Sequence, residues 1–200
     1  MGIKTIRITD FPIHSQFVEC WSPRAFTLDA IDEHALLTIL EAARWAPSSY
    51  NSQPWRFVYA RRETDQWVSF LSFLNEFNRS WAVRAAAIVV ILSKQTFRLP
   101  GRVEEFSLPT HSFDAGVAWA FLALQASLLG WGAHALAGIN RDLIRSDLSI
   151  PDDFSIEVCV ALGQSGDAAL LPHFLQAKEV PSNRRPLVDM AGEGRFVDGT

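Results

Sequence analysis

The sequence contains little cysteine. Its 200 residues include only two, Cys20 and Cys159, which lie far apart and have no second cysteine near either. This spacing excludes a disulfide framework, a zinc ribbon and a redox pair, and it fits a reducing cytoplasm, where we expect the protein to reside. The five histidines show no ligand spacing with one another or with a cysteine, so we expect no metal site.

An excess of basic residues is also missing. The chain has 18 Lys and Arg against 22 Asp and Glu, a formal net charge of -4, and the basic residues are scattered. A surface that follows a phosphate backbone needs clustered positive charge, so we expect no nucleic-acid partner. Residues 1–14 mix Lys4, Arg7 and Asp10 among apolar residues and lack the continuous apolar core of a signal peptide.

One uncharged stretch, residues 115–140, is long enough to span a membrane. Gly130, Gly132 and His134 interrupt it, and they leave an apolar helix from about His111 to Leu129. Such a helix is short for a bilayer and is better interpreted as buried, at a subunit interface. We therefore expect no membrane association.

Apolar residues are abundant, at 48% of the chain, and predict a large core. Helical and alternating patterns succeed one another, which favours an α+β layered fold, and the helix at 27–46 is expected to be capped by Thr27 or Asp29. From residue 166 onward the chain has little periodicity and predicts an extended tail. We predict helices over 27–46, 65–75, 111–129 and 140–148 and strands over 55–60, 85–92, 133–139 and 156–162.

The connector between the first helix and first strand has unusual chemistry. Six polar or turn-forming residues follow Pro47, and Pro54-Trp55 opens the strand. As structure alone, this is a connector whose Ser and Asn side chains satisfy nearby backbone groups. However, the run Ala46-Pro47-Ser48-Ser49, followed by Asn51, Gln53-Pro54-Trp55 and Phe57, resembles the signature of the FMN-dependent nitroreductase-like family.

The resemblance extends over most of the chain. The segment 21–26 is similar to the family's N-terminal phosphate-binding segment, 129–138 to its flavin-facing loop and strand, and 184–187 to its C-terminal phosphate clamp. Asn78, ahead of the strand at 85–92, matches an Asn at the flavin edge. By this resemblance the FMN-binding residues are Ser22, Arg24, Ser48, Ser49, Asn51, Asn78, Ala137, Gly138 and Arg184.

The residue types suit these roles. Arg184 and the Ser22 hydroxyl can hold a phosphate, and the Asn78 amide can both donate to and accept from the flavin pyrimidine edge. The alternatives are a solvated tail charge for Arg184 and a helix N-cap for Asn78. Ala137 and Gly138 would present backbone N–H groups to the ring.

The resemblance also implies a quaternary arrangement. We expect an α+β nitroreductase-like mixed layer fold, a central sheet flanked by helices, as one domain over residues 1–200. The expected assembly is a domain-swapped homodimer in which residues 166–200 wrap the partner, and Ser48 and Ser49 reach the partner's flavin. Two family cations are missing, because Cys20 stands where an Arg is usual and Trp81 where a Lys is frequent.

Two functions remain open. The first is an oxidoreductase that passes a hydride from NADPH or NADH through FMN to a nitroaromatic, quinone or similar small-molecule acceptor, in ping-pong fashion. The second is a low-turnover FMN-binding or flavin-sensing protein, which the two missing cations favour. A less favoured variant of the fold consumes its flavin. We assign no side chain as a catalytic acid or base, because the flavin carries the redox chemistry.

Overall fold

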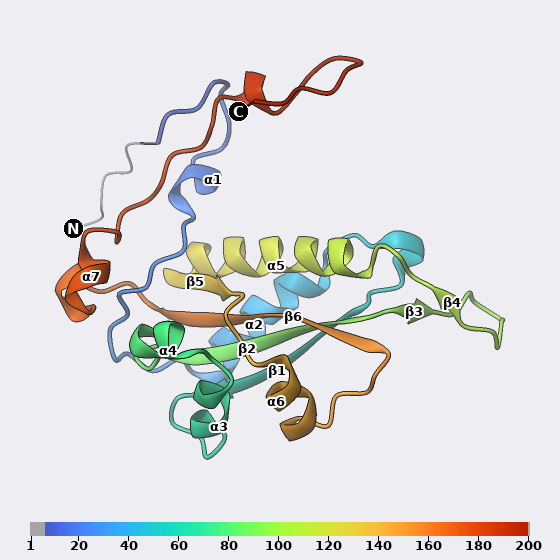
Figure 1. Cartoon of the computed structure of the whole chain (residues 1–200), viewed down its shortest axis with the longest axis horizontal. Coiled ribbons are helices and arrows are strands. Elements are labelled where there is room, and N and C mark those ends of the chain that lie inside the picture. Colours follow the sequence, from blue (N-terminus) through green and yellow to red (C-terminus); the bar gives the residue numbers. More distant parts are fainter. Residues whose placement is uncertain (1–6, 200) are drawn as a thin grey trace.

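A four-stranded antiparallel sheet forms the centre of the computed structural model, which describes residues 7–199 (Figure 1). Residues 1–6 and Thr200 lie outside the described residues. The former belong to the segment in which we expect no signal peptide, and Thr200 is the end of the expected tail. The strand order is β1-β2-β6-β5. The strands are β1 (Trp55–Arg61), β2 (Ala87–Lys94), β5 (Trp131–Leu136) and β6 (Phe154–Gln164).

Helices cover both faces of this sheet (Figure 1). One face carries α2 (Glu33–Arg44) and α5 (His111–Leu128), and the other carries α3 (Trp67–Ser72), α4 (Glu76–Ala82) and α6 (Arg141–Asp147). The expected α+β fold with a central sheet between helices is therefore confirmed. The smaller elements are α1 (Gln16–Glu19), α7 (His173–Gln176), the pair β3 (Thr96–Phe97) and β4 (Phe106–Ser107), and 3-10 turns at Ser49–Asn51, Ala168–Leu170 and Leu187–Asp189.

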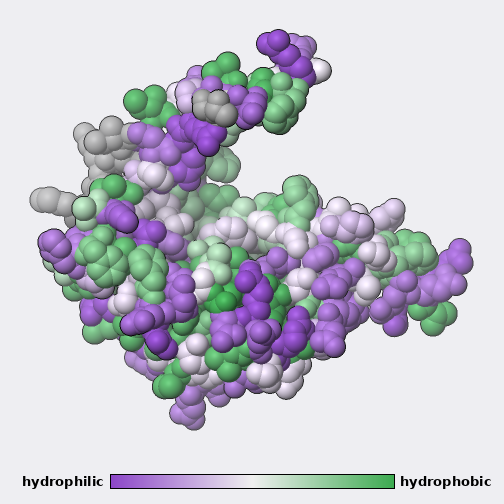
Figure 2. Space-filling view, in the orientation of Figure 1, coloured by the Kyte–Doolittle hydropathy of each residue, from purple (hydrophilic) through white to green (hydrophobic). Residues whose placement is uncertain are grey.

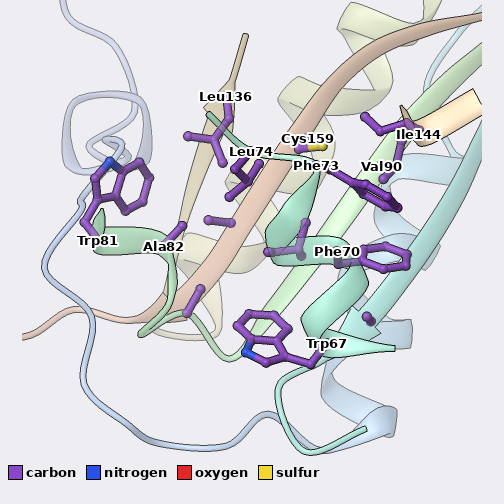
Figure 3. Packing of buried hydrophobic residues seen from close by; sticks show 14 of the residues in the cluster. Trp67, Phe70, Phe73, Leu74, Trp81, Ala82, Val90, Leu136, Ile144 and Cys159 are labelled. Atoms are coloured by element: carbon purple, nitrogen blue, oxygen red, sulfur yellow. The ribbon is translucent and has the colours of Figure 1, made fainter. Parts of the chain in front are cut away.

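The position of strand β2 inside the sheet explains why its sequence is an apolar run. Ile88 and Val90 face the cluster under α3, α4 and α6, while Val89 and Ile91 face the cluster under α2 and α5. Both faces of the strand are buried, so its residues are apolar except near its end, where the buried Ser93 hydroxyl is hydrogen-bonded to Glu157. Figure 3 shows part of the first cluster, in which aromatic and aliphatic side chains of α3, α4 and α6 pack with residues of the sheet, among them Val90 and Cys159.

Several expected boundaries are wrong. Helix α2 begins after Asp32, whose carboxylate accepts from the Ala35 N–H at 2.6 Å, so neither Thr27 nor Asp29 is the cap. The expected helix over 65–75 covers only α3, and α4 follows it behind its own cap, Asn75. Such short helices depend on caps and tertiary packing rather than on a long periodic pattern.

The long helix α5 is apolar on its outer side as well as its inner one. Phe113 and Leu128 are exposed, and Phe121 is partly so, although Leu122 and Ala126 are fully buried. Within residues 7–199, no helix is long and apolar enough to cross a membrane.

The tail leaves the body of the protein later than expected. Leu171 and Leu175 are buried in the same chain, and beyond Glu179 no described side chain is buried. Residues 181–199 then leave the body: up to about residue 190 they run beside residues 7–19, where the Leu187 N–H donates to the Asp10 carboxylate at 2.6 Å, and the rest loops outward (Figure 1). We call these two segments the terminal arm, which stands away from the body across a hollow (Figure 2). Its wrapping of a partner stays a prediction.

Candidate functional site

A cavity of about 600 Å³ lies between the terminal arm and the body. The segment before α2, the middle of α5, strand β5 and the tail all contribute to its wall. Its cationic side chains are Arg7, Arg24, Lys178 and Arg184, and its hydroxyl groups are Ser22 and Ser182. No Asp or Glu is among the described residues that line it. The cavity therefore favours an anion.

Three residues expected to bind FMN come together here: Ser22, Arg24 and Arg184. Arg184 is exposed, and its Nη1 donates to the Ser182 hydroxyl at 3.1 Å and to the Ser182 carbonyl at 3.3 Å. These hydrogen bonds, both within the tail, hold the Arg184 guanidinium beside Ser182. Ser182 lines the same cavity.

Arg24 is held in place by a buried carboxylate. Glu179, 6% exposed, accepts at Oε1 from the backbone N–H groups of Arg24 and Ala25, each at 2.7 Å. Its other oxygen lies 4.0 Å from Arg24 Nη1, while Arg24 Nε is buried without an acceptor among the described residues. The carboxylate fixes the backbone of the segment and leaves part of the guanidinium free.

His134 of β5 lines the cavity between the cations and α4. Its Nδ1 lies 3.1 Å from the Pro23 carbonyl, and its ring centroid lies 4.9 Å from that of Trp81. Burial lowers the pKa of His134, so the ring is neutral at neutral pH. Trp81 is only 1% exposed. A buried aromatic ring therefore occupies the position at which a Lys is frequent in the family that the sequence resembles.

Asn78 and Gly138 meet near the end of β5. Asn78, 8% exposed, donates from Nδ2 to the Gly138 carbonyl at 3.2 Å. Asn75 caps α4 by accepting from the Asn78 N–H at 2.8 Å, so the alternative of Asn78 as the cap is wrong. A Cβ on residue 138 would lie 2.4 Å from Asn75 Nδ2 and 2.7 Å from Asn78 Nδ2, so any larger residue would have to displace these two side chains. Ala137, the adjacent expected site residue, is exposed.

Ser48, Ser49 and Asn51 lie elsewhere in the chain. The Ser49 N–H donates to the buried Asp114 carboxylate at 3.2 Å, in the first turn of α5. Ser48 Oγ accepts from the Gln53 N–H at 3.0 Å, and Asn51 has a left-handed φ of 52°. None of the three is among the described residues of the cationic cavity, whose α5 wall is formed by residues 119–124. One chain does not bring them to the other site residues.

Comparison with known proteins identifies the family of the chain. Residues 19–164 match the model of the family described as the nitroreductase family. The chain belongs to the nitroreductase family. The match covers the whole sheet and the helices on both of its faces, as well as Ser22, Arg24, Asn78 and Gly138.

Individual relatives agree with the family assignment. A crystal structure described as an oxidoreductase containing FMN is 44% identical, with a TM-score of 0.94 over 99% of this chain and 100% of that one. A nitroreductase family protein of Clostridium difficile shares the fold, with 18% identity, a TM-score of 0.69, and coverage of 92% of this chain and 100% of that one. A Thermus thermophilus protein named NADH dehydrogenase is 25% identical over 187 residues, 80% of this chain and 89% of that protein.

Several residues of the cavity were not predicted from the sequence: Arg7, His134, Lys178 and Ser182. Lys178 and Ser182 lie close to Arg184 in the chain, and this proximity is the one signal that could have found them. Arg7 is in an irregular segment, where no pattern indicates its partners.

Proposed function

We propose that this nitroreductase-family protein is an FMN-dependent oxidoreductase that takes electrons from NADH or NADPH and passes them to a small-molecule acceptor. The observation that carries the proposal is the cationic cavity, which has no acidic residue among its described lining. Its wall combines segments inside the family match with Arg7 and the tail. The 44% identical protein described as containing FMN supports the same cofactor.

The residues present fit the phosphate end of FMN. A phosphate dianion prefers arginine forks, an ammonium group and hydroxyl donors, and the cavity supplies all three kinds. Arg24 Nε, a buried donor without an acceptor among the described residues, is a further group that an anion nearby would stabilise. Ser22 and Arg184 would therefore hold the phosphate, and Arg24 would lie beside N1 and O2 of the flavin pyrimidine.

Asn78, Ala137 and Gly138 lie near the end of β5, outside the described lining of the cavity, and they fit the flavin ring. Asn78 has both a donor and an acceptor in its amide, and it is already held against Gly138. The Asn78 amide would orient the pyrimidine edge, and the backbone of Ala137 and Gly138 would lie against the ring. FMN, when bound, supplies the hydride chemistry, so the side chains of this protein are needed to bind, orient and exclude water.

A homodimer would complete the site. The outer face of α5 is apolar and exposed, and Ser48, Ser49 and Asn51 lie apart from the cavity in one chain. A second copy packed on α5 would bury Phe113 and Leu128 and could bring its own Ser48, Ser49 and Asn51 to the flavin. The terminal arm, which buries no side chain beyond Glu179 in its own chain, would wrap that partner.

The dimer is tested by light scattering on the FMN-bound protein at micromolar concentration. Obligate dimers of this kind bury more than about 2,000 Å² in total, so we expect the mass of two chains. A folded monomer that still holds FMN would contradict the shared site.

The acceptor we propose is a nitroaromatic, a quinone or a similar electrophile. The proposal for the cofactor is tested by purifying the protein, releasing any bound chromophore and determining its mass. We expect FMN. A protein that neither carries FMN nor takes it up when FMN is added would contradict the proposed function.

A further inference from the structure

Arg7 enters the cationic cavity from the N-terminal part of the terminal arm. Its Nη1 donates to the carbonyl oxygens of Val18 at 3.0 Å and Cys20 at 2.8 Å. These two bonds hold the guanidinium against the segment that leads to Ser22 and Arg24. Arg7, Cys20 and Arg184 all line the same cavity.

Contacts within the described part of the chain satisfy only some of the hydrogen-bond donors of Arg7 and do not neutralise its charge. It forms no ion pair with a carboxylate of residues 7–199, and its Nε is buried without an acceptor in that part of the chain. Burial, and then the nearby charge of Arg184, lower the pKa of Arg7. Two guanidinium groups thus face one cavity that has no acidic residue among its described lining. An anion between them would relieve this repulsion.

Cys20 cannot supply a positive charge at this place. Its side chain is half-buried, and burial raises the pKa of the thiol, so it stays neutral. Arg7 lies directly over the Cys20 carbonyl and brings a cation to the wall that Cys20 leaves uncharged.

We propose that Arg7 is a phosphate-binding residue, and that Arg7 and Arg184, from opposite ends of the chain, hold the phosphate of FMN between them. The inference rests on the proposed function, since it takes FMN as the ligand. It adds that cofactor binding joins the two segments of the terminal arm through one dianion. The arginine fork suits this role, because Nη1 serves the two carbonyls and the remaining N–H groups can serve the phosphate.

The test compares FMN with riboflavin, which has the same ring and ribityl chain but no phosphate. Dissociation constants for both are measured by flavin fluorescence on the full chain and on Arg7→Gln. We expect Arg7→Gln to weaken FMN by about tenfold or more and to leave riboflavin unchanged within about twofold. Arg141→Gln is the matched control, because Arg141 also donates to backbone carbonyls, of Ile156 and Glu157, away from the cavity. It should bind both flavins as the unmodified protein does.

A rescue variant makes the test sharper. Cys20 lines the cavity beside Arg7, so Cys20→Arg added to Arg7→Gln should restore much of the FMN affinity without changing riboflavin binding. If Arg7→Gln does not fold, Arg7→Lys is used; it keeps the charge but loses the fork, and we expect an intermediate loss for FMN alone.

Equal weakening of FMN and riboflavin would overturn the proposal and mean that Arg7 only holds the Cys20 segment. Unchanged binding of both flavins by Arg7→Gln would overturn it as well. Either result leaves the proposed function intact, because the unmodified protein still binds FMN. Failure of the unmodified protein to bind FMN would instead overturn the proposed function, and this inference with it.

Discussion

The carboxylate of Glu179 accepts a hydrogen bond from the backbone N–H of Arg24, with 2.7 Å between Oε1 and the nitrogen. The same oxygen accepts from the Ala25 N–H, also at 2.7 Å. Glu179 is the last buried residue before the tail joins the terminal arm. One side chain therefore joins the start of the tail to the segment that carries Ser22 and Arg24.

Removing this carboxylate should loosen that segment. In Glu179→Ala, two backbone donors lose their acceptor, so we expect the free energy of unfolding to fall by about 1–3 kcal/mol and FMN affinity to fall with it. Glu179→Gln keeps an acceptor oxygen and should lose much less stability. Urea unfolding of the two variants measures the difference. Equal losses in both would mean that the charge, rather than the backbone hydrogen bonds, is what matters.

Arg24 should affect the reduction potential of bound FMN. Reduction puts negative charge on the flavin pyrimidine, which a nearby guanidinium stabilises. A charge-assisted hydrogen bond is worth about 1.5 kcal/mol at the lower end of its range, or about 30 mV for two electrons, and the adjacent Glu179 favours that lower end. Arg24→Gln should lower the midpoint potential by about this amount. An unchanged potential in a variant that binds FMN would mean that Arg24 does not face the pyrimidine edge.

Truncation of the tail should separate folding from cofactor retention. A chain that ends at Asn183 loses Arg184 but keeps the buried Leu171, Leu175 and Glu179, so we expect it to fold and to lose FMN on dialysis. A control that ends at Met190 keeps Arg184 and the Leu187–Asp10 hydrogen bond and should retain FMN. If the shorter chain also keeps its flavin through dialysis, Arg184 does not bind the phosphate.

His134 should make stability depend on pH. Burial lowers its pKa in the folded protein, whereas an unfolded histidine titrates near about 6.5. As pH falls through about 6.5, the unfolded chain takes up a proton that the folded chain does not, so stability falls until the folded-state pKa is reached. His134→Gln should flatten this part of the curve of unfolding free energy against pH. A variant curve that runs parallel to the original would show that another group is responsible.

The features that depend on residues close together in the sequence were predicted, and those that depend on tertiary packing were not. Strand β2 was placed from its apolar run because both faces of one strand are buried, and the family signature at residues 46–57 identified the fold. Helix α4 was missed because it is seven residues long and depends on Asn75 and on the packing of Trp81.

Only part of the cationic cavity could be predicted. The resemblance identified Ser22, Arg24 and Arg184, whereas Arg7 and Lys178 were missed because they join the other charges only in space. Arg7, Arg24, Lys178 and Arg184 come from both ends of the chain. The segments that carry them are held together by hydrogen bonds between distant residues, such as Glu179 with the Arg24 N–H and Asp10 with the Leu187 N–H, which no spacing encodes. Scattered basic residues in a chain of net charge -4 therefore gave no sign of a positive site. The grouping of Ser48, Ser49 and Asn51 with that cavity stays a prediction for the dimer.

The most direct test of the proposed oxidoreductase is anaerobic mixing of the FMN-loaded protein with NADH or NADPH while the visible flavin absorbance is followed. We expect prompt bleaching with at least one of the two, and return of the colour when a quinone or nitroaromatic is added. An FMN-loaded protein whose absorbance stays constant for hours with both nucleotides would contradict the oxidoreductase and favour a protein that only binds flavin.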